Sequence, residues 1–448
     1  MKTFKRSIWI LTLVLVTLSQ NLFAQNKILL INNVEIFNGS SENTIQGNIL
    51  IEGNTISRIS TAPIPTNKSA NVQLIDGKGK FLMPGLIDAH YHAMFSSLSQ
   101  IALLTSNIGF VNLVAGKNAE NLLMKGFTSI RDLGGPVFGL KQAIDNKVIP
   151  GPRIWPSGAF ISQTGGHGDF RLPNEIPSDP SNGLTYAERI NAAALADSPD
   201  AVRLRVREQL MLGASQIKLM AGGGVSSIYD PLDVTQYTEA EIRAAVEAAE
   251  NWGTYVTVHA YTPKAIQQAI RAGVKCIDHG QLIDEETVKM MVEKNIFWSL
   301  QPFVDEGDKG VLSPESRAKQ LEMYQGTDTA FELAKKYDMK IAYGTDVLFD
   351  AQKAAQPGLQ LVKMKRWFSN FQILQMATAN NAQLLELSGK RSPYSGKLGV
   401  IAEGALADLI LVDGNLIQNL ELITEPEKKH PAGHKGRSNL QKHPEVKL

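Results

Sequence analysis

This 448-residue chain contains a single cysteine, Cys276, and almost no excess of charge. One cysteine cannot form a disulfide within the chain, so the fold depends on its apolar core, and the apolar neighbours of Cys276 predict a buried thiol. The 45 lysines and arginines nearly balance the 44 aspartates and glutamates, which leaves a formal net charge of +1. We therefore expect neither nucleic acid nor an anionic membrane as a partner.

Long hydrophobic runs are also scarce, and the clearest lies near the N-terminus. This run, 8–18, is too short to span a bilayer; basic residues precede it, and a small residue, Ala24, follows it. The pattern predicts a signal peptide over residues 1–24, with a buried helix or a membrane anchor as the alternative. Because no cysteine lies nearby to accept a lipid, we expect a periplasmic or secreted protein that is free of the membrane after cleavage.

Two segments that flank the central part of the chain predict a small β domain. Short β-branched runs separated by turn residues occupy 25–80, and the first of them meets the pair Asn32-Asn33. The second segment, 391–424, contains an apolar run at 396–412 that predicts two strands around a turn. We expect the two segments to form one composite β-sandwich domain.

Residues 81–390 alternate short apolar runs with helical stretches, which is typical of strand–helix units. Eight such runs end near His92, Asp132, Gly158, Lys218, His259, His279, Gln301 and Asp346. Eight units in succession predict a (β/α)₈ TIM barrel, an α/β fold, with a doubly wound open sheet as the alternative.

Helix signals between these runs support the barrel. Thr238 and Glu241 form a capping box that predicts the start of a helix whose apolar face extends to Trp252. Pro263 predicts the start of the next helix, and Gly273 its end.

Residues of metal-ligand type gather at the ends of five of the apolar runs. They are His90 and His92 on the first run, Lys218 on the fourth, His259 on the fifth, His279 on the sixth and Asp346 on the eighth. His90 and His92 are two residues apart, so on a strand both side chains point to the same face and can share one ion. Because barrels have their active sites at the carboxyl ends of their strands, this arrangement predicts a metal-dependent hydrolase.

Lys218 is the most informative of these residues. A protonated amine would be repelled by a dication, whereas burial favours the neutral amine. A neutral amine can add carbon dioxide to give a carbamate, and the two carbamate oxygens can bridge two metals. A salt-bridged lysine is the alternative, but four histidines and Asp346 at matching strand ends favour the carbamate.

Four further features near the predicted barrel mouth bear on the site. His167 lies in a glycine-rich loop, and the segment 169–199, which contains Arg171, is expected to cover the mouth and shape specificity. No Gly-Lys-Ser/Thr follows the triplet Gly222–Gly224, so we interpret the triplet as a close passage of the chain past the metals rather than a phosphate-binding loop. Arg131 and its neighbour Asp132 are predicted to form a structural pair.

The motifs in order resemble the amidohydrolase superfamily, and within it the prolidase-like and imidazolonepropionase-like branch. They are Gly-Leu-Ile-Asp-Ala-His90-Tyr-His92, Gln-Ile-Lys218, Val-His259-Ala-Tyr261, Asp-His279-Gly and Gly-Thr-Asp346, and the resemblance extends over about residues 27–412. It implies two divalent ions, usually zinc. In this arrangement His90, His92 and Asp346 bind one ion, His259 and His279 bind the other, and N6-carboxylated Lys218 bridges them together with a hydroxide.

Four residues are candidates for roles in the chemistry of such a site. Two cations about 3.5–4 Å apart lower the pKa of a water between them, and the resulting hydroxide attacks an amide carbon. Asp346 acts first as general base and then as general acid. Tyr261 is the candidate donor to the oxyanion, with packing at the barrel rim as the alternative. His167 is the candidate for binding the oxyanion or the substrate carboxylate, and Arg171 is a further substrate-binding candidate.

The leading hypothesis is an exported amidohydrolase that cleaves an amide bond next to a carboxylate, in a dipeptide or an N-acyl amino acid, as prolidases and carboxypeptidases do. One alternative is hydrolysis of a cyclic amide, lactone or organophosphate ester, and another is a non-catalytic binding protein on the same scaffold. The residues leave homo-oligomerisation open. Residues 425–448 predict a disordered tail, and they lack the final strand with which relatives usually close the β domain.

Overall fold

The structure is a computed structural model. It describes residues 28–66, 72–177, 183–307 and 312–424. The predicted signal peptide and the predicted tail lie outside these ranges. Within them, no helix is both long enough and apolar enough to cross a membrane.

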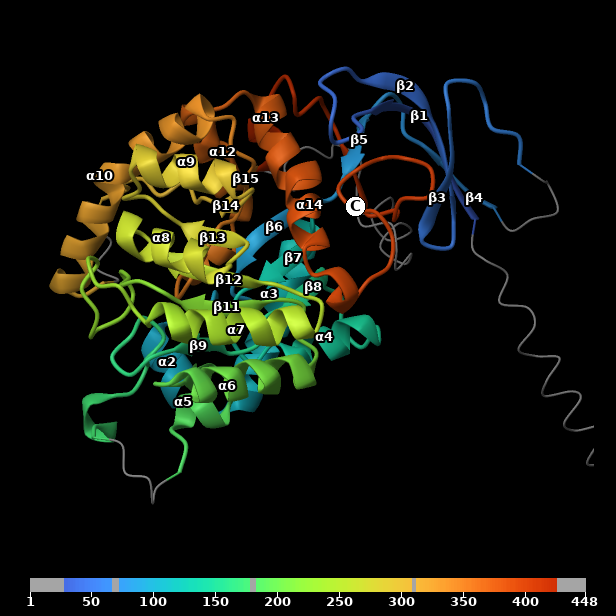
Figure 1. Cartoon of the computed structure of the whole chain (residues 1–448). Helices are drawn as coiled ribbons and strands as arrows, with labels where there is room; N and C mark the ends of the chain where they lie inside the picture. Colours follow the sequence, from blue (N-terminus) through green and yellow to red (C-terminus); the bar gives the residue numbers. More distant parts are fainter. Residues whose placement is uncertain (1–27, 67–71, 178–182, 308–311, 425–448) are drawn as a thin grey trace, which may run out of the picture.

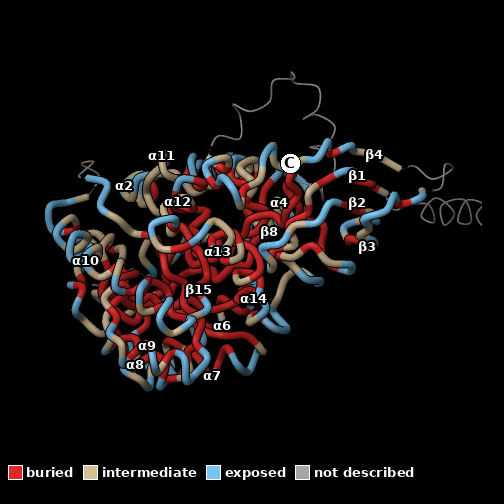
Figure 2. The backbone as a smooth tube through the Cα atoms, turned by 90° about the horizontal axis from the view of Figure 1, so that it is seen from above, coloured by how far each residue is buried: buried red, intermediate tan, exposed pale blue. Residues whose placement is uncertain are grey.

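A barrel of eight parallel strands forms the larger part of the molecule (Figure 1) and confirms the predicted fold. Its strands are β6 (Leu86–Tyr91), β7 (Phe127–Asp132), β8 (Arg153–Pro156), β11 (Ile217–Met220), β12 (Val256–Ala260), β13 (Cys276–His279), β14 (Phe297–Ser299) and β15 (Ile341–Ala342). Two short strands, β9 (Phe160–Ser162) and β10 (Ala193–Leu195), pair beside β11. Buried backbone lies mostly in the interior of the molecule, and exposed backbone lies mostly at its periphery (Figure 2).

Backbone hydrogen bonds close the barrel where the strand ladders are interrupted. The amide of Ala89 donates to the carbonyl of Tyr343 at 2.9 Å, which joins β6 to the chain after β15. The amide of Ser215 donates to the carbonyl of Pro156 at 2.7 Å, which joins β8 to the chain before β11. The carboxyl ends of all eight strands therefore meet around one opening.

Helices cover the outside of the barrel, and α6 to α10 pack against one another in chain order. The helices are α2 (Gln100–Thr105), α3 (Ile108–Met124), α4 (Phe138–Asp145), α5 (Tyr186–Arg189), α6 (Pro199–Leu212), α7 (Glu239–Asn251), α8 (Pro263–Ala272), α9 (Glu285–Glu293), α10 (Pro314–Lys336), α11 (Ala351–Ala354), α12 (Pro357–Lys363), α13 (Asn370–Gln375) and α14 (Asn381–Glu386). Short 3₁₀ turns lie at Pro173–Glu175, Met364–Arg366, Gly389–Arg391 and Leu420–Ile423, and a π turn at Met376–Asn380.

The predicted helix signals are confirmed, with one exception. The Thr238 capping box opens α7, Pro263 begins α8, and Gly273 ends α8 with a φ of 104°. Trp252 does not extend the buried face of α7 as predicted, since it caps the helix and is 38% exposed. The rest of the predicted face is buried, and it consists of Ile242, Val246 and alanines that pack against α6 and α8.

The small domain is a six-stranded sheet beside the barrel, built from both ends of the described chain. Its strands are β1 (Ile28–Ile36), β2 (Ile45–Glu52), β3 (Thr55–Ser60), β4 (Val72–Asp76), β5 (Phe81–Pro84) and β16 (Leu409–Val412). Their order is β16-β5-β1-β2-β3, and β4 also pairs with β1. The sheet has its own apolar core, which includes Ile31, Ile49, Leu82 and Leu409.

Two local predictions about this sheet were wrong. The pair Asn32-Asn33 does not end the first strand, because a β-bulge with Asn33 at a φ of 55° lets β1 continue to Ile36. The run 396–412 forms one strand, β16, rather than two. The chain before it is held by isolated bridges, such as the one between Lys397 and Ala405.

Candidate active site

The six predicted metal ligands line a single cavity at the carboxyl ends of the barrel strands. The cavity has a volume of about 230 Å³, and its lining includes His90, His92, Lys218, His259, His279 and Asp346. All six are buried or nearly so, and they come from β6, β11, β12, β13 and the segments after β6 and β15. The spacing of strand ends in the sequence therefore predicted a set of residues that the fold brings together.

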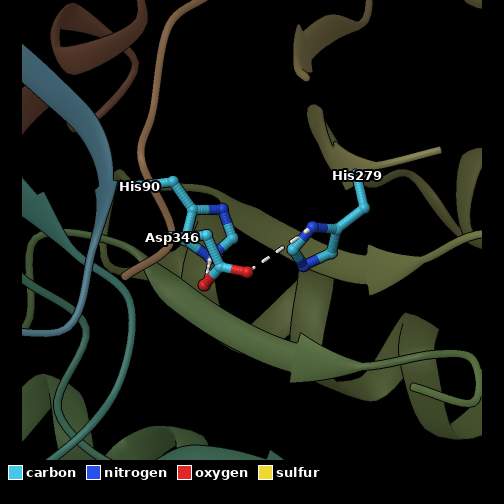
Figure 3. A group of neighbouring side chains, drawn as sticks. All are labelled: His90, His279 and Asp346. Carbon is cyan, nitrogen blue, oxygen red and sulfur yellow. Dashed lines mark ion pairs between the residues drawn. The ribbon is translucent and has the colours of Figure 1, made fainter. Parts of the chain in front are cut away.

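Figure 3 shows the carboxylate of Asp346 between the imidazoles of His90 and His279, and the imidazole of His92 is a third neighbour of this carboxylate. Its Oδ1 is 3.2 Å from Nε2 of His90 and 3.1 Å from Nε2 of His92, and its Oδ2 is 4.0 Å from Nδ1 of His279. One ligand atom from each of His90, His279 and Asp346 falls within 4.8 Å of the others. The ring of His259 lies 4.5 Å from that of His279, so the fourth histidine adjoins the same group.

Two of these residues have left-handed backbone conformations. His279 has a φ of 79° and Asp346 a φ of 48°, which non-glycine residues adopt at a cost of about 1–3 kcal/mol each. Gly344 lets the chain before Asp346 pass close to His90, because a Cβ at position 344 would lie 2.4 Å from the Cβ of His90. Such strain clusters at functional sites, so the backbone supports an active site at this position.

The buried environment sets the charges of the cluster. Burial lowers the pKa of His259 and of His279 well below the usual imidazole value, so both rings are neutral and each has a lone pair that can bind a cation. Burial alone would raise the pKa of the Asp346 carboxyl, but His90 and His92 hold that pKa well below its usual value. The site thus combines two neutral imidazoles, those of His259 and His279, with an ionised carboxylate.

Lys218 is fully buried on β11, and its Nζ lies 2.6 Å from Oδ2 of Asp278. Burial lowers the pKa of the Lys218 amine, and the charge of Asp278 opposes that shift only in part. The neutral amine, the form that reacts with carbon dioxide, is therefore more accessible here than in an exposed lysine.

Gln301, at the end of the seventh strand unit, is a site residue to which the sequence analysis gave no role. Nδ1 of His279 donates to Oε1 of Gln301 at 2.8 Å, and Nε2 of Gln301 donates to Nδ1 of His90 at 3.2 Å. One amide thereby fixes the orientation of two imidazoles, as residues around metal ligands commonly do. The signal was present, because Gln301 ends an apolar run in the same way as the ligands do.

Tyr261 and His167 both line the cavity, as expected of residues that contact a substrate. The ring of Tyr261 lies 5.1 Å from that of His279, and burial raises the pKa of the Tyr261 hydroxyl well above its usual value, which keeps it protonated and able to donate. The His167 ring stacks on His259 with centroids 4.0 Å apart. Its Nδ1 lies 2.7 Å from the hydroxyl of Ser227, which in turn donates to Asp230.

The glycine triplet makes room for His167. A Cβ at Gly224 would lie 2.0 Å from the His167 ring, and one at Gly223 would lie 1.7 Å from the carbonyl oxygen of Pro231. Lys319 of α10 holds this loop by donating to the Gly224 carbonyl at 2.7 Å and to two further carbonyls. The close passage predicted from the glycines therefore brings the chain against an imidazole that adjoins His259.

Arg171 is not among the residues that line the cavity. Its Nε donates to Oδ1 of Asp169 at 2.8 Å, so the guanidinium pairs with a carboxylate only two positions earlier. A contact of Arg171 with substrate therefore stays a prediction from sequence alone. Its neighbour Phe170 does line the cavity, together with Phe160 and Phe349.

The predicted pair of Arg131 with Asp132 was wrong. Side chains of adjacent strand residues point to opposite faces, and Arg131 points into the barrel, where it pairs with Asp278 at 2.6 Å. Asp132 instead accepts from the backbone amide of Ala93 at 2.7 Å. Cys276 is buried as expected, with its Sγ 3.5 Å from the Arg131 guanidinium.

The donor set fits divalent metal ions. Four imidazoles, an ionised carboxylate and a lysine that can become a carbamate offer the nitrogen and oxygen ligands that zinc accepts, and these side chains are buried or nearly so. A (β/α)₈ barrel with such a set at the carboxyl ends of its strands defines the class of metal-dependent hydrolases.

Comparisons with known proteins identify the family. The model of the amidohydrolase family matches residues 81–439, and the chain belongs to that family. It is 32% identical over 364 residues to ochratoxinase from Aspergillus niger, a match that covers 77% of this chain and 73% of the relative. The chain is therefore a hydrolase of amide or peptide bonds.

Two solved structures refine the likeness. A prolidase in complex with N-methylphosphonate-L-proline has a TM-score of 0.81 at 34% identity, covering 89% of this chain and 96% of the prolidase. An Xaa-Pro dipeptidase with methionine bound in its active site has a TM-score of 0.76 at 29% identity, covering 89% and 97%. The resemblance to the prolidase-like branch is thereby confirmed.

Proposed function

We propose that this chain is an exported hydrolase with two divalent metal ions, zinc in the native enzyme, that cleaves an amide bond next to a carboxylate. Dipeptides and N-acyl amino acids are the substrate class. The observation that supports this most directly is that all six predicted ligands line one buried cavity. The N-terminal pattern supports export, and the mature enzyme of this proposal acts in the periplasm or outside the cell.

In this proposal each side chain of the cluster has a defined task. His90, His92 and Asp346 would hold one ion, and His259 and His279 would hold the other. Lys218, as a carbamate, would supply oxygen ligands to this site. When bound, two such ions lower the pKa of a water and polarise the amide carbonyl.

The protein's own groups move the protons and hold the substrate. Asp346, held ionised by the neighbouring imidazoles, takes the proton of the attacking water and delivers it to the leaving nitrogen. The protonated hydroxyl of Tyr261 donates to the oxygen on which negative charge develops. Nδ1 of His167 donates to Ser227, whose hydroxyl donates to Asp230, so a hydrogen bond from His167 to the oxyanion or to the substrate carboxylate requires a second proton, on Nε2.

The relatives support the substrate class. The prolidase binds N-methylphosphonate-L-proline and the dipeptidase binds methionine, so each of these two sites accepts a ligand that carries an amino-acid carboxylate. Ochratoxinase, a third relative, is also an amide hydrolase.

A substrate panel tests the proposal. We expect the purified enzyme, loaded with zinc in bicarbonate buffer, to release amino acids from dipeptides or N-acyl amino acids, and a His259→Ala variant to lose that activity. Parallel assays with cyclic amides, lactones and organophosphate esters test the alternative substrates. Turnover confined to those compounds, or no turnover of any of them, would contradict the proposed substrate class.

A further inference from the structure

Arg131 is a completely buried cation at the centre of the barrel. Its Nε donates to the carbonyl of Ala89 at 2.5 Å, and its terminal nitrogens lie 3.1 Å from the Tyr255 hydroxyl and 2.6 Å from Oδ1 of Asp278. Ala89 directly precedes His90. One guanidinium therefore fixes the backbone of β6 next to a predicted metal ligand and a carboxylate on β13 next to another.

Asp278 is the point at which these contacts meet Lys218. Its Oδ1 accepts from Arg131, and its Oδ2 accepts from Nζ of Lys218 at 2.6 Å and from the Thr257 hydroxyl at 2.8 Å. Both Asp278 and Arg131 are fully shielded from solvent. A buried carboxylate with such partners holds one geometry, because breaking any of these bonds leaves a charged group unsatisfied.

The contacts of Asp278 also determine which cation pairs with its carboxylate. Arg131 pairs with Asp278 at 2.6 Å, so the carboxylate keeps a cationic partner when Lys218 is neutral. Asp278 can therefore act as a hydrogen-bond acceptor for the lysine nitrogen whether or not that nitrogen is charged.

We propose that Arg131 and Asp278 are positioning residues that hold Nζ of Lys218 for its carboxylation. This inference rests on the proposed function, which requires the carbamate. In the reaction the amine lone pair forms a bond to the carbon of carbon dioxide, and one N–H proton leaves to water, which gives a carbamate anion. The carbamate nitrogen keeps one N–H, and Asp278 accepts it, which turns the two carbamate oxygens away from Asp278.

The experiment measures the carbamate directly. Wild-type enzyme, Asp278→Asn and the charge-balanced double variant Arg131→Met/Asp278→Asn are titrated with ¹³C-bicarbonate in the presence of zinc, and the carbamate carbon is followed by NMR. Thermal melting reports on folding. The matched control is Arg153→Met/Asp408→Asn, which removes another Arg–Asp pair, with Nε and Oδ2 2.7 Å apart, at the junction of the barrel and the sheet.

We expect the carbamate signal of the double variant to be absent or to need about ten-fold more bicarbonate, the loss expected when a charge-assisted hydrogen bond is removed. The control should keep the wild-type bicarbonate dependence even if its melting temperature falls, which separates positioning from stability. Should Asp278→Asn fold poorly because Arg131 has lost its partner, the double variant decides.

A folded double variant with a wild-type carbamate titration would overturn the positioning role and leave the proposed function intact. Absence of a carbamate in wild-type enzyme that hydrolyses the panel would instead refute the lysine bridge, and the inference with it.

Discussion

At the scale of single residues, Asp346 has three properties that rarely occur together. It is ionised because neighbouring imidazoles lower its pKa, its backbone is left-handed, and its Oδ1 lies close to Nε2 of both His90 and His92. An aspartate at the surface is ionised without such neighbours and does not require a left-handed backbone. Together they describe a carboxylate held in place for a reaction rather than for stability, since the strained backbone costs free energy of folding.

The first prediction concerns this carboxylate. Asp346→Asn should lower kcat by about 100- to 10,000-fold, the usual contribution of a general acid–base group, because the amide cannot take up the proton of the attacking water. Steady-state kinetics on the most active dipeptide measures the loss, and metal analysis of the variant separates a catalytic from a binding defect. A variant with full metal content and near-normal kcat would contradict the assignment.

The second prediction concerns the position of His167. Gly224→Ala should lower kcat/KM by about 100-fold, because its Cβ would fall 2.0 Å from the His167 ring and displace it from the cavity. The matched control is Gly222→Ala, whose Cβ would meet its nearest neighbour, Ala260, at 3.4 Å. Equal activity of the two variants would show that His167 does not contribute to turnover.

At the scale of elements, the contact between β6 and the segment after β15 closes the barrel, because it joins the first and last barrel strands. Asp88 of β6 accepts from the amide of Thr345 at 3.1 Å, from the Thr345 hydroxyl at 2.6 Å and from the amide of His90 at 3.0 Å. The buried carboxylate of Asp88 thus links Thr345, which directly precedes Asp346, to the backbone of His90.

The third prediction follows from this contact. Thr345→Val should reduce the free energy of unfolding by about 1–3 kcal/mol, because it leaves Oδ2 of the buried Asp88 without its hydroxyl donor. Urea denaturation measures the change. Thr327→Val in α10 is the matched control, since the Thr327 hydroxyl is buried without a hydrogen-bond partner within the part of the chain that the structure describes. Equal losses in both variants would contradict a specific role for the Asp88 contact.

Elements that depend on local sequence were predictable, and those that depend on distant partners were not. The strand ends that hold His259 and His279 could be located because a buried strand is a short apolar run and its end is marked by a polar residue. The partner of Arg131 could not be predicted, since Asp278 is 147 positions away and becomes a neighbour only when the barrel closes. The bulge at Asn33 was missed for a related reason, because pairing with β2 overrides the local turn preference.

At the scale of the whole molecule, the fold collects the predicted metal ligands from five places in the chain into one cavity. The cost is a barrel centre that contains imidazoles and ionised carboxylates instead of apolar side chains. The order of motifs was enough to predict this convergence, because every barrel strand ends at the same face. Which nitrogen of each imidazole faces its neighbours was not predictable, since it depends on Gln301 and Asp346.

The fourth prediction links this cavity to the stability of the molecule. Ions that bind only the native state stabilise it by about 4 kcal/mol when present at a thousand times their Kd. Chelation should therefore lower the melting temperature and abolish activity, and added zinc with bicarbonate should restore both. A His259→Ala/His279→Ala double variant, which keeps His90, His92 and Asp346, should regain only part of the melting temperature and none of the activity. The prediction would be contradicted if chelation removed the metal and left the wild-type melting temperature unchanged. In that case metal binding by the buried histidines would not stabilise the native state.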